Sequence, residues 1–218
     1  MKQENKRSLF LSLCLLASFV LWTVLVCILD VKPIGPKGSS VGLATINGAF
    51  HSLTGVHMTL YTITDWLGLV PIAVALGFGI LGLCQWIRRK HIAKVDFSIL
   101  ALGGFYVIVI AVYILFERVV INHRPVLING FLEVSYPSST TLLVMCVMPT
   151  AMMQFYTRIK NQFWRKCVTC IHLVFILFTV LGRLISGVHW LSDIIGGALL
   201  SAGLVLFYRF MININNTL

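Results

Sequence analysis

The sequence predicts an all-α membrane protein whose six transmembrane helices form one bundle, and three observations support this prediction. Hydrophobic residues make up 58% of the chain and charged residues 11%, whereas a soluble domain carries about 25% charged residues. Six apolar stretches approach the roughly 20 residues that a helix needs to cross a bilayer. Basic residues are concentrated in alternate connections, as is typical of a membrane protein with several spans. We expect the 218 residues to form a single integral-membrane domain, 1–218, because they leave no room for a separate soluble module.

The predicted spans cover residues 9–29, 66–87, 97–116, 140–156, 167–184 and 190–212. The first has a basic start and an apolar core of about 20 residues, longer than the 7–15 of a cleaved signal peptide, so we expect a retained membrane anchor. The fourth is short, and we expect it to begin a little earlier, at Ser138. Gly196, Gly197 and Ala198 in the sixth span are expected to allow neighbouring helices to approach closely.

The basic residues predict the orientation of the bundle. With the N-terminus inside, the inner segments hold twelve Lys and Arg residues and the outer segments hold five. Since basic residues flank membrane helices on the cytoplasmic side, both termini are predicted to be cytoplasmic. The same bias accounts for the net charge of +10. Nucleic-acid binding is not predicted, because no basic patch with interleaved aromatic residues accompanies this charge.

The first outer connection, residues 30–65, is the longest. Residues 44–60 mix apolar side chains with Asn47, His51 and His57, which is typical of an interfacial helix or a pair of such helices. His51 and His57 could be ligands, although such residues are more often satisfied polar groups. The six cysteines lie almost entirely in apolar stretches, and the Cys167-x2-Cys170 spacing has no second pair to complete a site. We therefore predict no metal, no cofactor and no disulfide framework.

Arg183, His189 and Asp193 lie within twelve residues between the last two spans. Ionisable residues at a membrane boundary are costly, so this cluster indicates a functional site. His189 and Asp193 are four residues apart and share a face on a helix, so the carboxylate can hold one ring nitrogen and leave the other basic. Arginine is a forked donor suited to phosphate. A His-x3-Asp pair at a helix start can also be a simple capping pair.

Two further polar clusters are predicted on the same outer side. Glu117, Arg118 and Arg124 follow the third span, and a Pro-Ser-Ser run at residues 137–139 opens the fourth. Free backbone N–H groups at a helix start, with hydroxyls beside them, form an anion site. Two arginines and this helix start would together hold a phosphate, and a histidine beside it could attack the phosphorus.

The three clusters resemble the motifs of the type 2 phosphatidic acid phosphatase family, which also contains the vanadium haloperoxidases. The family pattern is Lys-x6-Arg-Pro, then Pro-Ser-Gly-His, then Ser-Arg-x5-His-x3-Asp, and the resemblance covers the six helices in order. The matching positions in this chain are Arg124, Pro125, Pro137, Ser138, Arg183, His189 and Asp193, with Gly182 in place of the serine.

The resemblance implies a phosphatase or diphosphatase that acts on lipid phosphates without a metal. It implies that His189 is the nucleophile and forms a phosphohistidine, and that Asp193 orients it. The resemblance also implies that Arg124, Arg183, Ser138 and the Ser139 backbone bind the phosphate oxygens. The expected partners are a lipid phosphate substrate and membrane lipids; the oligomeric state is not predicted.

Two departures from the family pattern matter for the chemistry. The family lysine maps to Glu117, whose charge is wrong for a phosphate ligand, and Arg118 beside it could substitute. The histidine that protonates the leaving group maps to Thr140, with His123 as a possible replacement. General acid catalysis contributes about 10²–10⁴-fold. A diphosphate tolerates its loss better, because the leaving lipid phosphate has a second pKa of about 6. The departures therefore favour a polyprenyl diphosphate such as undecaprenyl diphosphate.

The leading hypothesis is a lipid phosphatase in a bacterial plasma membrane, with its site facing outside. Two alternatives stay open. One is a catalytically impaired relative that binds a lipid phosphate as a sensor or scaffold, supported by Glu117 and Thr140. The other is a phosphotransferase that passes the phosphoryl group from His189 to a lipid or sugar acceptor. A channel or transporter is disfavoured, because the charged residues cluster at the outer surface rather than at mid-membrane.

Overall fold

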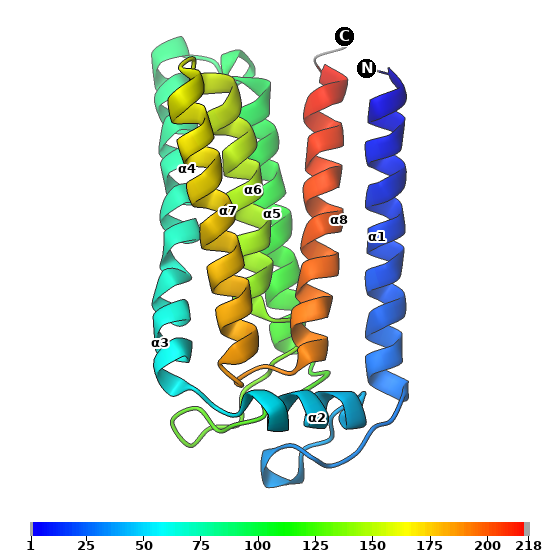
Figure 1. The fold of residues 1–218 in the computed structure, drawn as a ribbon. Helices are drawn as coiled ribbons and strands as arrows, with labels where there is room; N and C mark the ends of the chain where they lie inside the picture. The colour runs from blue at the N-terminus through cyan, green and yellow to red at the C-terminus, as the bar shows by residue number, and fades with distance from the viewer. Residues whose placement is uncertain (1, 216–218) are drawn as a thin grey trace.

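The computed structural model describes residues 2–215, which form a bundle of long helices with both chain ends at the same end of the bundle (Figure 1). The elements in order are α1 (Lys2–Ile28), η1 (Pro36–Gly38), α2 (Ala44–Thr54), α3 (Met58–Leu67), α4 (Leu69–Arg89), η2 (Ile92–Lys94), α5 (Phe97–Arg118), α6 (Ser139–Arg158), α7 (Gln162–Ile185) and α8 (Leu191–Asn215). Within this part of the chain there are isolated β-bridges but no strands. The predicted all-α class is confirmed.

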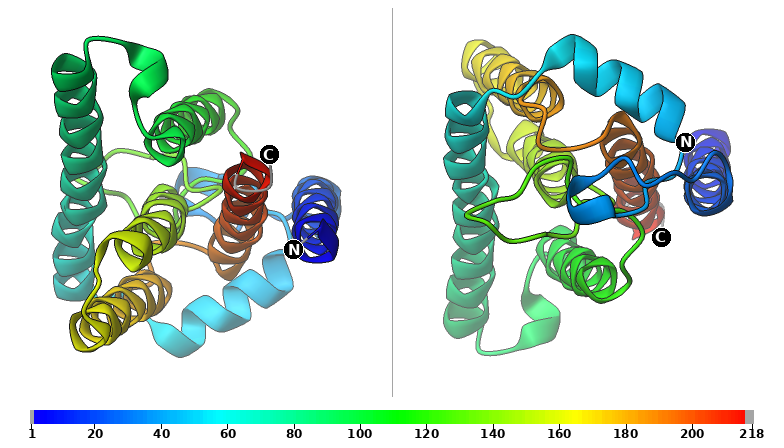
Figure 2. Two further views of the ribbon diagram at one scale, coloured as in Figure 1. Left: turned by 90° about the horizontal axis from the view of Figure 1, so that it is seen from above. Right: turned by 90° about the horizontal axis from the view of Figure 1, so that it is seen from below.

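Five segments are long and apolar enough to cross a membrane, which supports an integral membrane protein. They are Gln3–Ile28, Met58–Arg89, Phe97–Arg118, Gln162–Ile185 and Leu191–Ile214. The long helix absent from this set is α6, which packs against α4, α5, α7 and α8 in the middle of the bundle (Figure 2). Because its neighbours enclose it, α6 can bury polar side chains such as Thr150 and Gln154. The sixth span and the cytoplasmic location of the termini stay predictions.

The first connection is more ordered than a loop. Helix α2 lies across the end of the bundle, where an interfacial helix was expected (Figure 1). The prediction that the second span begins at residue 66 was wrong, because α3 and α4 together form a segment that starts at Met58. Thr59, Thr62, Thr64 and Asp65 interrupt the apolar pattern of this first part. Helix α3 instead packs against α7, and so brings polar residues to the site.

Small residues on α8 let the segment before α6 pack closely against this helix. A Cβ atom on Gly196 would lie 2.7 Å from the Tyr136 hydroxyl oxygen, and one on Gly197 would lie 3.2 Å from the Thr141 Cγ2 atom. Tyr136 is also stacked on Phe19, with ring centroids 6.4 Å apart. The close approach expected at these glycines is confirmed, and it brings the second sequence motif against the third.

Candidate active site

The connections that carry the three motifs meet at the end of the bundle opposite the chain termini (Figures 1 and 2). The turn from α7 to α8 carries His189, and it depends on Gly187. Gly187 has φ +69°, and a Cβ atom there would lie 1.9 Å from the carbonyl oxygen of Gly55. Only glycine permits both this backbone conformation and this approach. The His57 N–H donates to the Ser186 carbonyl at 2.9 Å, so the α2–α3 connection is fastened onto this turn.

His189 is enclosed and neutral. Its side chain is 1% exposed, and within the described residues neither ring nitrogen has a hydrogen-bond partner. Burial, together with the positive charges of Arg124 and Arg183, holds the pKa of His189 well below its ordinary value. A neutral imidazole keeps a free lone pair, which a nucleophile or base requires.

Asp193 lies close to His189 and also caps α8. Its Oδ2 atom is 3.6 Å from His189 Nδ1, which is longer than a hydrogen bond. The same oxygen accepts a hydrogen bond from the Trp190 N–H at 2.9 Å, and Oδ1 accepts one from Asn122 Nδ2 at 3.4 Å. Asp193 therefore performs the capping that the sequence spacing allowed, and in addition places a carboxyl group beside the imidazole.

Two asparagines that the sequence motifs did not identify hold the start of α8. Asn47 on α2 accepts a hydrogen bond from the Ser192 N–H at 3.1 Å and donates to Ser192 Oγ at 2.9 Å. Asn122 accepts one from the Gly42 N–H at 3.1 Å while its amide nitrogen faces Asp193. Both asparagines are 1% exposed. Asn47 thus connects α2 to Ser192, and Asn122 connects the α5–α6 connection to the Asp193 carboxyl group.

Arg124 is positioned by a short hairpin. The Arg124 N–H donates to the Glu133 carbonyl at 3.0 Å, and the Ser135 N–H donates to the Asn122 carbonyl at 3.0 Å. The Arg124 Nε atom lies 3.0 Å from Glu133 Oε2, in an ion pair. Its Nη1 atom is buried and has no partner among the described residues. One edge of this guanidinium is thus held by a carboxylate, and a second donor is available to a ligand.

Arg183 is held in the same manner by α3. Its Nη2 atom donates to Asp65 Oδ1 at 3.1 Å, while Nε and Nη1 are buried and lack partners within the described residues. A Cβ atom on Gly182 would lie 2.6 Å from Thr64 Cγ2. The glycine that replaces the family serine therefore lets α3 approach α7, and this approach brings Asp65 to Arg183.

Tyr61, one turn before Asp65 on α3, joins the two arginines. Its ring centroid is 4.8 Å from the guanidinium carbon of Arg183 and 5.7 Å from that of Arg124. Cations over an aromatic face are stabilised by its quadrupole. The Tyr61–Asp65 spacing of four residues places both on one helix face, which is the one signal by which sequence reasoning could have found them.

Ser138 is the N-cap of α6 and is fully buried. Its Oγ atom accepts a hydrogen bond from the Thr141 hydroxyl at 3.0 Å, which leaves its own proton free for a ligand. Its backbone N–H donates to the Asp193 carbonyl at 3.1 Å. The first N–H groups of α6, which begins at Ser139, have no acceptor within the helix. Thr140 is 8% exposed, and its Cγ2 atom packs near Gly68.

The remaining candidate residues contribute less directly. Glu117 and Arg118 are exposed at the end of α5, and Glu117 lines a small cavity with Ser139. The carbonyl of His123 accepts a hydrogen bond from Trp190 Nε1 at 2.7 Å, and no contact joins the His123 side chain to His189 in the described part of the chain. Of the two histidines in the first connection, His51 packs its ring 5.5 Å from Trp190, and His57 contacts the Thr54 carbonyl. No group of three or more possible metal ligands occurs among the described residues.

The model of the PAP2 superfamily matches residues 122–216, which include Arg124, Ser138, Arg183, His189 and Asp193. This part of the chain therefore resembles the PAP2 superfamily. The predicted resemblance is thereby confirmed. The match begins at Asn122, so the first connection and α3 lie outside it. Tyr61, Asp65 and Asn47 therefore join the site from outside the matched region.

A solved structure has the same fold. It is the crystal structure described as the first transmembrane PAP2 type phosphatidylglycerolphosphate phosphatase from Bacillus subtilis. It has a TM-score of 0.59 and 18% sequence identity to this chain, and the alignment covers 94% of this chain and 96% of that one. The shared fold thus extends over nearly the whole length of both chains. No curated protein sequence matches this chain.

Asn47→Ala should loosen the start of α8. The substitution leaves the buried Ser192 N–H and Gly42 carbonyl without their partner, which costs about 1–3 kcal/mol for an unsatisfied buried group. We expect a lower thermal midpoint and faster amide exchange at Ser192. The exposed Ser52→Ala on the same helix is the control and should leave both unchanged. Unchanged exchange at Ser192 in the Asn47 variant would show that α2 does not hold α8.

Proposed function

We propose that this protein is a membrane lipid phosphatase that works through a phosphohistidine on His189, with one phosphatase domain across residues 1–218. The observation that supports this most strongly is the set of buried donors without partners. Arg124 Nη1 and Arg183 Nε and Nη1 have no partners, and both arginines act electrostatically on the buried His189. Such groups are costly unless a ligand satisfies them. A phosphate offers several charged acceptors to forked guanidinium donors.

In the first step, the lone pair on His189 Nε2 attacks the terminal phosphorus. This assignment follows from the position of Asp193, which faces Nδ1 and so favours a proton on that nitrogen. A P–N bond forms, and the bond from phosphorus to the bridging oxygen breaks with its electron pair leaving on the lipid. Arg124, Arg183 and the start of α6 stabilise the charge that develops on the phosphoryl oxygens.

In the second step, water attacks the phosphohistidine. The P–N bond breaks, its electron pair returns to Nε2, and phosphate is released. The water supplies the hydroxyl group of the phosphate and one proton, which balances the proton that the departing lipid has taken up. Asp193 stabilises the positive imidazole in both steps, because its carboxylate is fixed by Trp190 and Asn122.

The substrate that we favour is a polyprenyl diphosphate such as undecaprenyl diphosphate. Thr140 occupies the position of the family acid, and a threonine hydroxyl does not donate a proton near neutral pH. A departing lipid phosphate needs less protonation than an alkoxide does. The likeness to a phosphatidylglycerolphosphate phosphatase makes phosphate monoesters the competing substrate class. We place the site on the outer side of a bacterial plasma membrane, from the distribution of basic residues.

A second candidate function is favoured by one observation. Arg124 and Arg183 each already pair with a carboxylate, Glu133 and Asp65. These pairs reduce the positive charge offered to a phosphate. Together with Thr140, they favour a catalytically impaired relative that binds a lipid phosphate as a sensor or scaffold.

His189→Ala should abolish phosphate release. With the protein purified in detergent and in EDTA, we expect wild type to release phosphate from undecaprenyl diphosphate faster than from phosphatidic acid. The variant should lose more than about 1000-fold, the scale seen when a nucleophile is removed. The measurement is the initial rate of phosphate release for both substrates.

The outcomes separate the proposals. Equal release from both substrates keeps the phosphatase and rejects the leaving-group argument. No release from either, with retained binding of the lipid phosphate, supports the impaired relative. Radiolabel on a lipid or sugar acceptor instead of free phosphate would identify a phosphotransferase.

Arg124→Gln should shift the pH profile. A nearby positive charge disfavours the imidazolium, so its removal should raise the pKa of His189. The acid limb of kcat/KM, which reports the free enzyme, should therefore move to higher pH, while in wild type it lies below the usual value of about 6.5. Arg124→Lys keeps the charge and should keep the limb in place, although both variants lose rate. An acid limb that stays in place in Arg124→Gln would contradict this account.

His123→Gln tests the replacement acid. If His123 protonates the leaving group, the variant should slow phosphate monoesters by about 10²-fold or more and leave diphosphates nearly unaffected. The rates should also depend more steeply on leaving-group pKa across a series of aryl phosphates. His57→Gln, which is exposed and bound to the Thr54 carbonyl, is the control. The same slope in wild type and in His123→Gln would exclude His123 from this role.

A further inference from the structure

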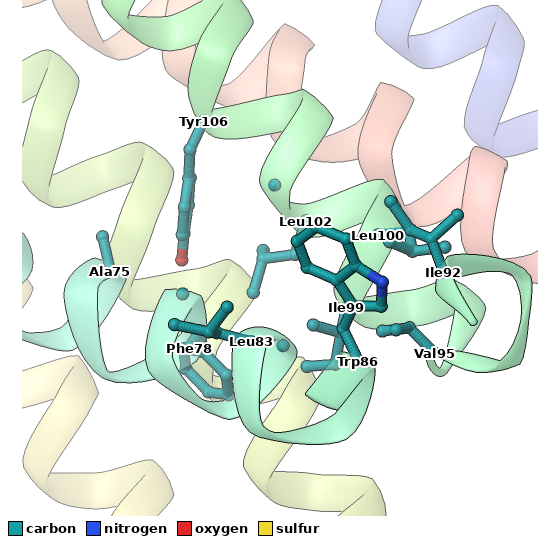
Figure 3. A pocket seen from close by; sticks show the side chains of 13 residues that line it. Ala75, Phe78, Leu83, Trp86, Ile92, Val95, Ile99, Leu100, Leu102 and Tyr106 are labelled. Carbon is teal, nitrogen blue, oxygen red and sulfur yellow. The ribbon is translucent and has the colours of Figure 1, made fainter. Parts of the chain in front are cut away.

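An apolar groove lies between α4 and α5, near the end of the bundle opposite the candidate active site (Figure 3). Its volume is ≈ 290 Å³. The walls include Phe78, Leu83 and Trp86 from α4, and Ile99 and Leu102 from α5. Tyr106 also lines the groove, but its hydroxyl lies 3.3 Å from Thr150 Oγ1 on α6. The lining therefore suits a hydrocarbon chain and has few polar groups for any other ligand.

Two glycines leave the groove open. A Cβ atom on Gly79 or on Gly103 would meet no heavy atom within 4 Å. Leu83 and Trp86 are each 49% exposed, so the groove is accessible from outside the bundle. Both helices belong to candidate membrane spans, and the surroundings of the groove are then lipid chains. An empty space there would forfeit dispersion contacts on every wall, which a lipid chain restores.

The connection at the end of this groove carries unpaired positive charge. Arg88, Lys90 and Lys94 are exposed and make no ion pair within the described residues. The acidic residue of this region is Asp96, and it already pairs with Arg89 at 2.9 Å and with Arg158 at 3.6 Å. Three cationic side chains of this connection therefore have no acidic partner among the described residues. Ile92 and Val95 of the same connection line the groove, so these cations lie beside it.

We propose that the groove binds an anionic phospholipid of the membrane leaflet opposite the candidate active site. One acyl chain occupies the space beside Gly79 and Gly103, and the phosphate of the headgroup contacts Arg88, Lys90 and Lys94. Clusters of basic residues directly beside a membrane helix attract anionic lipids by about 1 kcal/mol for each residue. Trp86 lies at the same level, where tryptophans anchor helices at the membrane surface. This site goes beyond the proposed phosphatase function and does not depend on it.

The charges favour this occupant over two others. The distal part of a prenyl tail could reach the groove from the candidate active site, but it is uncharged and would leave the three cations unused. A second copy of the chain, related by a two-fold axis through this face, would bring Arg88, Lys90 and Lys94 against the same cations of its partner. Like charges placed opposite one another across an interface disfavour it.

The test uses lipids with brominated acyl chains, which quench nearby tryptophans. The full-length protein is placed in phosphatidylcholine nanodiscs that contain a small fixed fraction of brominated phosphatidylglycerol or of brominated phosphatidylcholine. The signal from Trp86 is the difference between wild type and Trp86→Phe, because the chain has five tryptophans. We expect the anionic lipid to quench Trp86 preferentially. Replacing Arg88, Lys90 or Lys94 by Gln should reduce this preference by about five-fold each.

A matched pair of glycine variants tests the groove itself. Gly79→Leu fills the space, whereas Gly77→Leu on the same helix adds the same side chain away from the groove, and its Cβ atom also meets nothing within 4 Å. Leucine favours a helix more than glycine does, so both variants should fold. We expect Gly79→Leu to lose the preference for the anionic lipid and to retain less phosphatidylglycerol in native mass spectra. Gly77→Leu should match wild type in both measurements.

Three outcomes would overturn the proposal. Equal quenching by the two headgroups would show an ordinary layer of surrounding lipid. Displacement of the brominated lipid by undecaprenyl diphosphate would assign the groove to the tail of that lipid. A Gly79→Leu variant that changes the oligomeric state, with no change in lipid preference, would assign the groove to a second copy. None of these results bears on whether His189 releases phosphate.

Discussion

The burial of two guanidinium groups beside one neutral histidine is the constraint on which the rest of this structure depends. Arg183 is 1% exposed and Arg124 8%, and buried like charges are strongly destabilising without partners. The fold provides one carboxylate for each arginine and places the ring of Tyr61 against both. Three guanidinium nitrogens, Arg124 Nη1 and Arg183 Nε and Nη1, still have neither a hydrogen bond nor an ion pair in the described part of the chain. Part of this energetic cost therefore stays uncompensated at the site, where the proposed phosphate would offset it.

The first connection supplies several of the contacts that hold this site together. Helix α2 fixes the start of α8 through Asn47, and α3 supplies Tyr61 and Asp65. The substitution of glycine at position 182 is part of the same arrangement, because it lets α3 approach α7. Gly182, which stands in place of the family serine, thus permits the approach that brings Asp65 to Arg183.

The two ends of the bundle differ in their chemistry. At the site, carboxylates accompany the arginines, and buried asparagines and Ser138 satisfy backbone and side-chain groups. At the other end, the connection between α4 and α5 has three unpaired cations beside an apolar groove. The first arrangement suits a phosphate that must be bound and released with geometric precision. The cations and the apolar groove suit a lipid, which is bound less rigidly, because its depth in the membrane matters more than its orientation.

The sequence by itself determined the membrane class, five of the spans and the unit formed by Arg183, His189 and Asp193. The class and the spans depend on composition and on the lengths of the apolar stretches. The three residues of the unit are close in the sequence, but they lie in α7, in the α7–α8 turn and in α8, so the expected shared helix face of His189 and Asp193 is replaced by a turn. It did not determine the start of α3, or the places of Tyr61, Asp65, Asn47 and Asn122. Those residues reach the site across separations such as 118 residues for Asp65 and Arg183, and 145 for Asn47 and Ser192. Tertiary packing alone decided them, because no periodicity in a sequence records which distant helix faces will meet.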